Sequence, residues 1–328
     1  MPVSFDAYKG MQRIPEFAFE DLSEVLQDAQ SFVWMTITSP TPPELQSIKE
    51  EFGLHELAIE DALTAHQRAK LEEYDDTLFL AVHTAELDVE DIHYRELHAF
   101  IGKQFVILIQ NRNLVDHDRV RARFENTKSA FPKGPGYVLY LVLDALVDEF
   151  LVVASHLQNQ LDTLEESIFG SEQDRPLIEH LYDLKRDVAK LHNTASPVAD
   201  ICSALSHLHP HVVSKDLRPY YRDVHDHAVR VVKHTEMLRD ALSDAMQVNL
   251  ALFTVRQNEF TVRQNEVVKR LAGWGAILAI PTMLFSMYGM NFKYMPELDS
   301  PYGYPVVLAV TLVGCVLLYL RLKRAGWL

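Results

Sequence analysis

The sequence predicts an α+β domain followed by long helices and two C-terminal membrane-spanning helices. Three observations support this fold class. Residues 1–135 mix strand-like and helix-like segments, the stretch from 219 to 273 has no Gly or Pro between its ends, and residues 269–328 contain two long uncharged runs. We therefore divide the chain into an α/β domain at 1–135, a helical hairpin at 136–218, a stalk helix at 219–270 and a two-span pore segment at 271–328.

Within the α/β domain, strands are expected where Val, Ile, Phe and Leu accumulate. The expected strands are 32–38, 77–87, 92–101 and 104–110, and the expected helices are 42–52 and 55–65. Gly134, Pro135 and Gly136 then interrupt the chain. Two further helices are expected after this break, at 137–170 and 174–208.

Charge is distributed unevenly along the chain. The whole sequence has a formal charge of −15, but residues 269–328 carry six basic and two acidic side chains, so residues 1–268 alone carry −19. A body this acidic repels phosphates and attracts cations, which disfavours a nucleic-acid partner. The two cysteines, Cys202 and Cys315, exclude a disulfide framework and indicate a reducing compartment. The N-terminus lacks the pattern of a signal peptide, so we expect the C-terminal end to enter the membrane.

Two uncharged runs, 271–290 and 302–320, each match the roughly 20 residues that a helix needs to cross ~30 Å of hydrocarbon. A pair of buried helices in a soluble protein is the alternative, but both runs have basic residues at their outer ends. Lys269 and Arg270 precede the first run, and the second is followed by Arg321, Lys323 and Arg324. We expect the two spans to cross the inner or plasma membrane. Because basic residues favour the cytoplasmic side of a membrane, both termini should lie in the cytoplasm.

The region before the first span is expected to be one long helix. Apolar residues recur in it at intervals of seven, for example Val224, Val231, Leu238 and Ala245, which is typical of a helix packed along other helices. A tandem repeat, TVRQNEF followed by TVRQNEV, occupies 254–267. Because the unit has heptad length, it lengthens the helix and preserves its face to within ~20°. A neutral duplication explains the repeat equally well.

One face of the first span and of the residues before it carries only small or uncharged side chains, at steps of three and four. We call this set the uncharged face: Asn265, Val268, Ala272, Gly275, Ala279, Thr282 and Ser286. Such a face serves either close helix packing or the lining of a pore for a hydrated cation. Two spans cannot enclose a pore, so the second interpretation requires several copies of the chain in a ring.

The two spans and the loop between them contain three motifs: Tyr288-Gly289-Met290-Asn291, Met295-Pro296-Glu297-Leu298 and Gly303-Tyr304-Pro305. In this order and spacing, and with the basic ending KRAGWL, they closely resemble the CorA family of magnesium channels. Upstream segments resemble the family as well, among them 59–63 and 221–227. The resemblance covers nearly the whole chain. It implies a cytoplasmic αβα sandwich, long helices and a funnel-shaped homopentamer in the bilayer, with the first span lining the pore.

The resemblance also implies where ions bind. Gly289, Met290 and Asn291 would form the outer mouth, where five Asn side chains contact a Mg²⁺ ion that keeps its water, since Mg²⁺ dehydrates reluctantly. Glu297 would concentrate cations nearby. Mg²⁺ is then both the transported ion and a regulatory ligand, and no organic cofactor is implied. In its regulatory role it would bridge three acidic residues between subunits and hold the channel closed: Glu60, Asp61 and Asp223.

Other functions are disfavoured or stay open as alternatives. The chain has 15 histidines but no HExxH or paired CxxC motif, and no Walker loop or GxGxxG, so neither a zinc hydrolase nor an ATP-driven pump is expected. We expect uptake of magnesium, with cobalt and nickel as further candidates, and no enzymatic activity. One alternative is a zinc transporter of the same superfamily, which the histidines favour and Met290 disfavours. The other is a membrane-anchored scaffold or sensor without flux.

Overall fold

The computed structural model of the chain describes residues 3–10, 12–15, 22–64, 68–110, 117–127, 134–168, 175–291, 293, 295 and 299–328. The chain divides into two compact units, Met1–Met246 and Gln247–Leu328. The first unit is built around a β-sheet covered by helices. The second consists of the C-terminal part of one long helix and a second helix that follows it.

The sheet of the first unit has seven strands in the order β2-β1-β3-β7-β6-β5-β4. Their bounds are β1 Val3–Lys9, β2 Gln12–Arg13, β3 Ser31–Thr38, β4 Lys70–Tyr74, β5 Thr77–Asp88, β6 Asp91–Ile101 and β7 Phe105–Gln110. Only β3 and β7 pair in parallel, and the other neighbours are antiparallel. The sheet is therefore mixed, with β4 at one edge.

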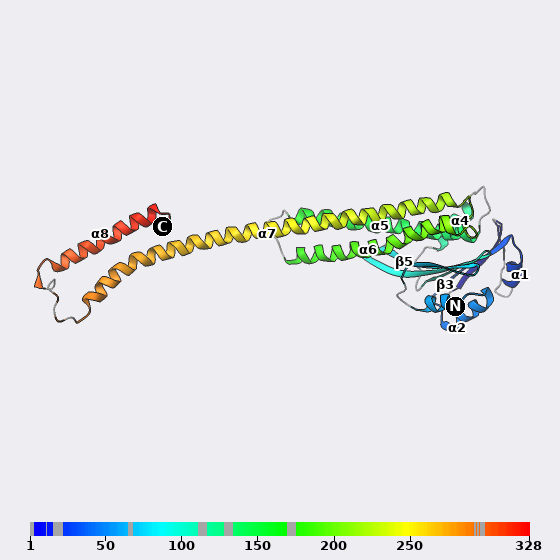
Figure 1. Cartoon of the computed structure of the whole chain (residues 1–328), viewed down its shortest axis with the longest axis horizontal. Helices are drawn as coiled ribbons and strands as arrows, with labels where there is room; N and C mark the ends of the chain where they lie inside the picture. The colour runs from blue at the N-terminus through cyan, green and yellow to red at the C-terminus, as the bar shows by residue number, and fades with distance from the viewer. Residues whose placement is uncertain are drawn as a thin grey trace. The chain divides into compact units, whose positions relative to one another are not determined.

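Helices cover both faces of this sheet (Figure 1). One face carries α1 (Leu22–Gln27), α2 (Pro42–Phe52) and α3 (Glu56–Leu63), and the other carries α4 (His117–Asn126), α5 (Pro135–Ile168) and α6 (Arg175–Leu208). Strand β3 lies in the interior of the sheet, and its side chains pack against helices on both faces. Val33, Met35 and Ile37 belong to the core with α1–α3, whereas Phe32 and Trp34 pack on Phe124 of α4. This three-layer arrangement confirms the predicted mixed domain.

The bounds of α2 follow from local sequence signals. At its start, the Thr41 backbone N–H donates to Glu44 Oε2 (2.7 Å), one half of a capping box, and Pro42 occupies the first turn. At its end, Gly53 has a left-handed conformation with φ of 62°. Residues with a Cβ rarely adopt this conformation, so glycine ends the helix here.

The long helix α7 runs from Arg218 to Tyr288. Its first part belongs to the first unit, where it packs on α5 and α6: His234 Nε2 lies 3.2 Å from Gln158 Oε1, and Thr235 Oγ1 lies 3.0 Å from His192 Nδ1. The heptad positions Val224, Val231, Leu238 and Ala245 are all buried. The predicted helix-packing face is therefore confirmed in this part of α7.

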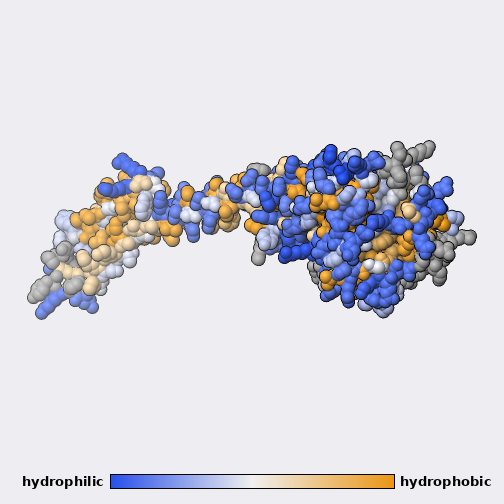
Figure 2. All heavy atoms as spheres, turned by 45° about the vertical axis from the view of Figure 1, so that its right-hand side comes forward, coloured by the Kyte–Doolittle hydropathy of each residue, from blue (hydrophilic) through white to orange (hydrophobic). Residues whose placement is uncertain are grey.

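The second unit contains the rest of α7 and α8, Gly303–Arg324. Both helices are long and apolar enough to cross a membrane, by length and composition. They correspond to the two predicted spans, although α7 ends at Tyr288 rather than at residue 290. In the space-filling view, hydrophobic side chains cover much of the visible surface of this unit (Figure 2).

Candidate functional site

Among the described residues of the second unit, one face of α7 contacts α8. Buried or half-buried positions recur along it at steps of three or four, and include Gly273, Ile277, Leu284 and Tyr288. The thiol of Cys315 in α8 lies 3.7 Å from the backbone oxygen of Ile277. A Cβ on Gly273 would lie 3.3 Å from the side chain of Leu328. The glycine therefore allows the C-terminal residue to pack closely against α7.

The uncharged face of α7 points away from α8. Its seven residues are all exposed within the chain, and at ~100° per residue they lie on roughly the opposite side of the helix from the α8 contacts. The two glycines illustrate the difference, because a Cβ on Gly275 would meet nothing within 4 Å. The small side chains of this face therefore do not serve the packing of α7 on α8.

The predicted pore-mouth motif lies directly after α7. The N–H of Gly289 donates to the carbonyl oxygens of Phe285 (3.0 Å) and Ser286 (3.1 Å), which closes the last turn. Met290 and Asn291 are exposed, and Glu297 lies outside the described residues. A Cβ on Gly289 would make only ordinary contacts of 3.5 Å, so the single chain does not require glycine at this position.

The end of α7 is suited to a cation. The C-terminal end of a helix carries about half a negative charge. This helix end precedes the exposed amide of Asn291. Backbone carbonyls and a side-chain amide offer oxygen atoms without a fixed charge, which can accept hydrogen bonds from water bound to a cation.

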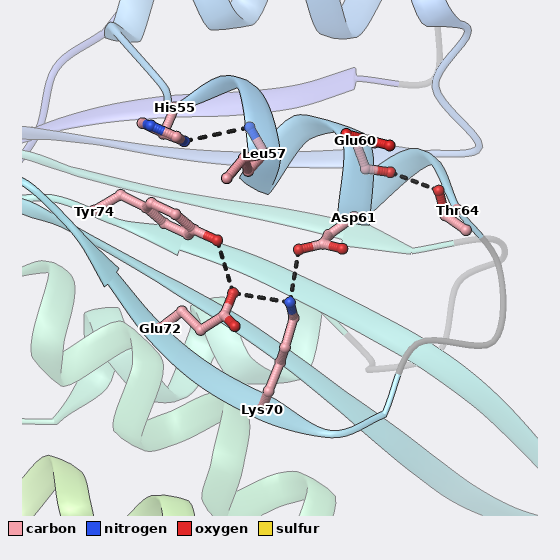
Figure 3. Close-up of polar contacts among 8 residues, drawn as sticks. All are labelled: His55, Leu57, Glu60, Asp61, Thr64, Lys70, Glu72 and Tyr74. Atoms are coloured by element: carbon pink, nitrogen blue, oxygen red, sulfur yellow. Dashed lines mark hydrogen bonds and ion pairs between the residues drawn. The ribbon is translucent and has the colours of Figure 1, made fainter.

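The first unit holds the predicted regulatory residues Glu60 and Asp61 near the end of α3 (Figure 3). At the start of this helix, His55 Nδ1 accepts a hydrogen bond from the Leu57 N–H (3.3 Å), and the His55 ring stacks on Tyr74 at 4.5 Å. These contacts fix α3 against strand β4. They place Asp61 opposite the first residue of that strand, Lys70.

Lys70 holds two carboxylates at once. Its Nζ lies 2.6 Å from Asp61 Oδ2 and 2.8 Å from Glu72 Oε2, and the Tyr74 hydroxyl donates to the same Glu72 oxygen at 2.8 Å (Figure 3). Burial lowers the pKa of Lys70, but its hydrogen bonds to Asp61 and Glu72 outweigh this and raise it. The hydrogen bond from Lys70 also lowers the pKa of Glu72.

Asp61 is therefore ion-paired within its own chain. Its side chain is 22% exposed and paired through Oδ2, so an added cation must share this carboxylate with Lys70 or displace it. Glu60 is exposed beside it. The backbone oxygen of Glu60 accepts a hydrogen bond from the Thr64 hydroxyl at 2.8 Å.

The third predicted regulatory residue, Asp223, belongs to a different cluster. Ligand atoms of Asp144 on α5 and of Asp223 and His227 on α7 all lie within 4.8 Å of one another. Asp144 is buried and ion-paired with Arg123. Asp223 is 64% exposed, and its carboxylate lies 3.9 Å from His227 Nε2.

Neither Asp144 nor His227 is among the site residues predicted from the sequence. The signal for Asp144 was present, because it is an acidic residue in the middle of the apolar run YVLYLVLDALV. A buried carboxylate needs a partner, and such a residue marks either an ion pair or a metal site. Within one chain, Asp61 and Asp223 thus lie in two separate clusters, each with its own charged partner.

Comparison with known proteins gives one family. The sequence profile described as CorA-like Mg²⁺ transporter protein matches residues 29–324. A relative from Thermotoga maritima named cobalt/magnesium transport protein CorA is 31% identical over 324 residues, covering 97% of this chain and 90% of the relative.

Two solved structures share the fold. The complete structure of the CorA magnesium transporter from Methanocaldococcus jannaschii superimposes with a TM-score of 0.71 at 20% identity, over 100% of both chains. The cytoplasmic domain of ZntB from Vibrio parahaemolyticus superimposes with a TM-score of 0.57 at 12% identity, over 68% of this chain and 88% of that domain. The fold alone therefore does not distinguish between these two proteins.

Proposed function

The chain belongs to the CorA-like Mg²⁺ transporter family, and we propose that it is a membrane channel for uptake of Mg²⁺, with Co²⁺ and Ni²⁺ as further substrates. It acts as a homopentamer and not as an enzyme. The two spans cross the inner or plasma membrane with both termini in the cytoplasm. Support for this orientation comes from the basic residues at the outer ends of the spans.

The observation that carries the proposal is the direction of the uncharged face of α7. This face leads to Gly289, Met290 and Asn291 and does not contact α8. In a ring of five copies it surrounds the axis, while the α8 helices lie on the outside. Its residues offer hydroxyl, amide and backbone oxygens but no fixed charge, so the ion passes with water still bound.

Selection in this proposal occurs at the end of α7. Five Asn291 amides accept hydrogen bonds from the hydration shell of Mg²⁺, and five helix ends add about half a negative charge each. Glu297 attracts cations to the mouth. The driving force is the ion gradient and the membrane potential, which contributes about 4.6 kcal/mol per 100 mV for a divalent ion.

Uptake into proteoliposomes tests this assignment. We expect Mg²⁺ flux in the wild type and at least a roughly tenfold loss in Asn291→Ala, because about 1.4 kcal/mol of lost interaction at the mouth is tenfold. Asn126→Ala is the matched control, since it removes the same amide from an exposed position at the end of α4. Unchanged flux in Asn291→Ala would refute the role of this residue.

Regulation is proposed to occur between subunits. Mg²⁺ prefers six oxygen ligands, several of them water, and each acidic cluster of one chain offers only part of such a set. Asp144 is paired with Arg123, and Asp61 is paired with Lys70. We infer that Asp223 of one subunit and Glu60 and Asp61 of its neighbour hold one regulatory Mg²⁺ in the closed state.

Inhibition of flux by internal Mg²⁺ tests the regulatory site. Asp223→Ala and Asp61→Ala should each require more internal Mg²⁺ for closure. Asp226→Ala is the control, because Asp226 is an exposed acid in the same helix whose contact is His225. Wild-type inhibition in the first two variants would exclude these residues as regulatory ligands.

Zinc transport is the second candidate function. It is favoured by the 15 histidines of the chain, all of which lie in the first unit. The same uptake assay decides between the candidates. Flux of Zn²⁺ without Mg²⁺ would identify a zinc transporter, and no flux of Mg²⁺, Co²⁺ or Zn²⁺ would identify a scaffold or sensor.

A further inference from the structure

A second type of metal-binding chemistry lies in the first unit, away from the acidic clusters described above. Strand β4 presents Glu73 toward the segment between α6 and α7, where His209 and His211 lie. Ligand atoms of these three residues are all within 4.8 Å of one another. Two imidazoles and one carboxylate are ligands that Zn²⁺ and related first-row transition metals prefer, whereas Mg²⁺ prefers oxygen alone.

The three side chains are close enough together to share one ion. His209 Nδ1 lies 3.0 Å from Glu73 Oε2, and His211 Nε2 lies 3.6 Å from Glu73 Oε1. Ligand atoms at ~2.0–2.1 Å from a tetrahedral Zn²⁺ are about 3.3 Å from one another. The two observed distances, to the two oxygens of the Glu73 carboxylate, are close to this value. Glu73 is partly exposed, so water can supply a fourth ligand.

The ring nitrogens that face Glu73 are buried without a hydrogen bond. Among the residues that the structure describes, neither His209 Nδ1 nor His211 Nε2 has a hydrogen-bond partner of acceptable geometry. His209 is only 12% exposed, and a buried polar atom of this kind is costly. A metal ion bound by both rings would give each of these nitrogens a partner.

The segment that carries the histidines is held in place. Val212 and Val213 are buried, and the Val213 N–H donates to the His209 carbonyl oxygen at 2.9 Å. A side chain on Gly136 of α5 would collide with the carbonyl oxygen of Val212, so the two backbones are in close contact. Binding of a metal therefore requires little ordering of His209 and His211.

We propose that Glu73, His209 and His211 form a site for a first-row transition-metal ion, with Zn²⁺ as the preferred occupant. The ion joins the edge strand β4 to the segment between α6 and α7. Strand β4 also carries Lys70 and Glu72, so the ion restrains the strand that holds Asp61. The proposal is independent of Mg²⁺ transport, because it uses none of the residues assigned to the pore or to regulation.

Zn²⁺ binding to the purified full-length chain tests the site. The protein is first stripped with a chelator, and excess Mg²⁺ is then added so that oxygen-rich sites hold Mg²⁺. Calorimetric titration with Zn²⁺ should give one site per chain in the wild type. His209→Ala, His211→Ala and Glu73→Gln should each weaken binding at least about tenfold, since even indirect ligand contacts cost 10–100-fold.

Two control variants separate this site from other histidines. His207→Ala removes an exposed ring at the end of α6, and His227→Ala removes the imidazole of the Asp144 and Asp223 cluster. Both should keep wild-type affinity. Zn²⁺ should raise the melting temperature of the wild type but not that of the three site variants, whose metal-free melting temperatures show that they fold.

Three results would overturn the proposal. The first is that the wild type does not bind Zn²⁺ in the presence of Mg²⁺. The second is that the site variants bind Zn²⁺ with the affinity of the wild type, and the third is that only His227→Ala loses binding. Any of them would leave the cluster as an ion pair between Glu73 and the histidines. Mg²⁺ flux is measured separately and is expected to be unchanged in Glu73→Gln, so failure of this site and failure of the transport proposal are distinguishable.

Discussion

The two units of the chain differ in the burial of their large apolar side chains. In the first unit, Trp34, Phe79, Phe100 and Phe150 are completely buried. In the second, most large apolar residues of α7 and α8 are exposed, including Leu271, Met283 and Leu312. Burial of such surface contributes about 25 cal/mol per Å² in water, so an uncovered surface of this size indicates a different solvent. The first unit contains its own core, whereas the exposed apolar surface of the second is suited to lipid.

Polar residues differ between the units as well. In the first unit, charged side chains are held by specific partners, as Asp61 is by Lys70 and Asp144 by Arg123. In the second, the polar residues of the uncharged face carry no charge and are exposed in the described part of the chain. In the proposed function, this contrast corresponds to regulation by the first unit and conduction by the second.

The largest expected effect concerns the core of the first unit. Phe100→Ala removes a fully buried ring that packs on Phe79 at 5.0 Å, and should lower the free energy of unfolding by about 3–5 kcal/mol. Phe260→Ala removes an exposed ring of α7 in the second unit. It should change the free energy of unfolding of the first unit by less than about 0.5 kcal/mol. Denaturant unfolding can be followed by Trp34 fluorescence with Trp274 and Trp327 replaced by Phe. Equal effects would contradict the contrast between the units.

A charge placed on α8 tests the solvent of the second unit. Val313→Arg introduces a cation in the middle of α8 and should disfavour membrane insertion by about 2.5–3.5 kcal/mol. Val89→Arg is the matched control at the turn between β5 and β6, where the side chain is 89% exposed. An insertion assay compares the two. If Val313→Arg inserts as well as the wild type, α8 does not face lipid at this position.

A smaller effect is expected from the buried His98 on β6. Burial lowers the pKa of His98 below 6.5, against the opposing effect of Glu96. The unfolded chain therefore binds more protons than the folded one below about pH 6.5, and stability falls as the pH falls, by at most about 1.4 kcal/mol per pH unit. His98→Phe should show a weaker fall in melting temperature between about pH 6.5 and 5. Identical pH profiles for both proteins would show that His98 does not contribute.

The predicted strands and helices that proved correct had strong local signals. The strand predicted at 32–38 is β3, Ser31–Thr38, an apolar run, and the helix predicted at 42–52 is α2, whose ends carry a capping box and Gly53. The missed elements include β1, Val3–Lys9, and several polar or short segments. Strand β4 reads KLEEY and lies at the sheet edge, and α4 reads HDRVRARFEN with Val120 and Phe124 buried. Hydrophobic periodicity hardly marks such segments.

The same distinction applies to the candidate sites. The uncharged face and the motif at 288–291 are local patterns, so the sequence contains them completely. The pairing of Asp61 with Lys70 and the meeting of Asp144, Asp223 and His227 depend on contacts between separate elements. Glu73 and His209 likewise come from a strand and from a distant segment between helices. Such partners follow from the tertiary fold and not from spacing along the chain.

The central claim is that the uncharged face of α7 lines a Mg²⁺ pathway, and cysteine accessibility tests it most directly. Ala279→Cys lies on that face, and Leu278→Cys is its neighbour outside it, both in a chain with Cys315→Ser. Cys202 can remain, because burial raises its pKa to about 12 and leaves little reactive thiolate. A water-soluble thiol reagent should block Mg²⁺ flux in Ala279→Cys and leave Leu278→Cys unaffected. Block of Leu278→Cys with no effect on Ala279→Cys would contradict the account.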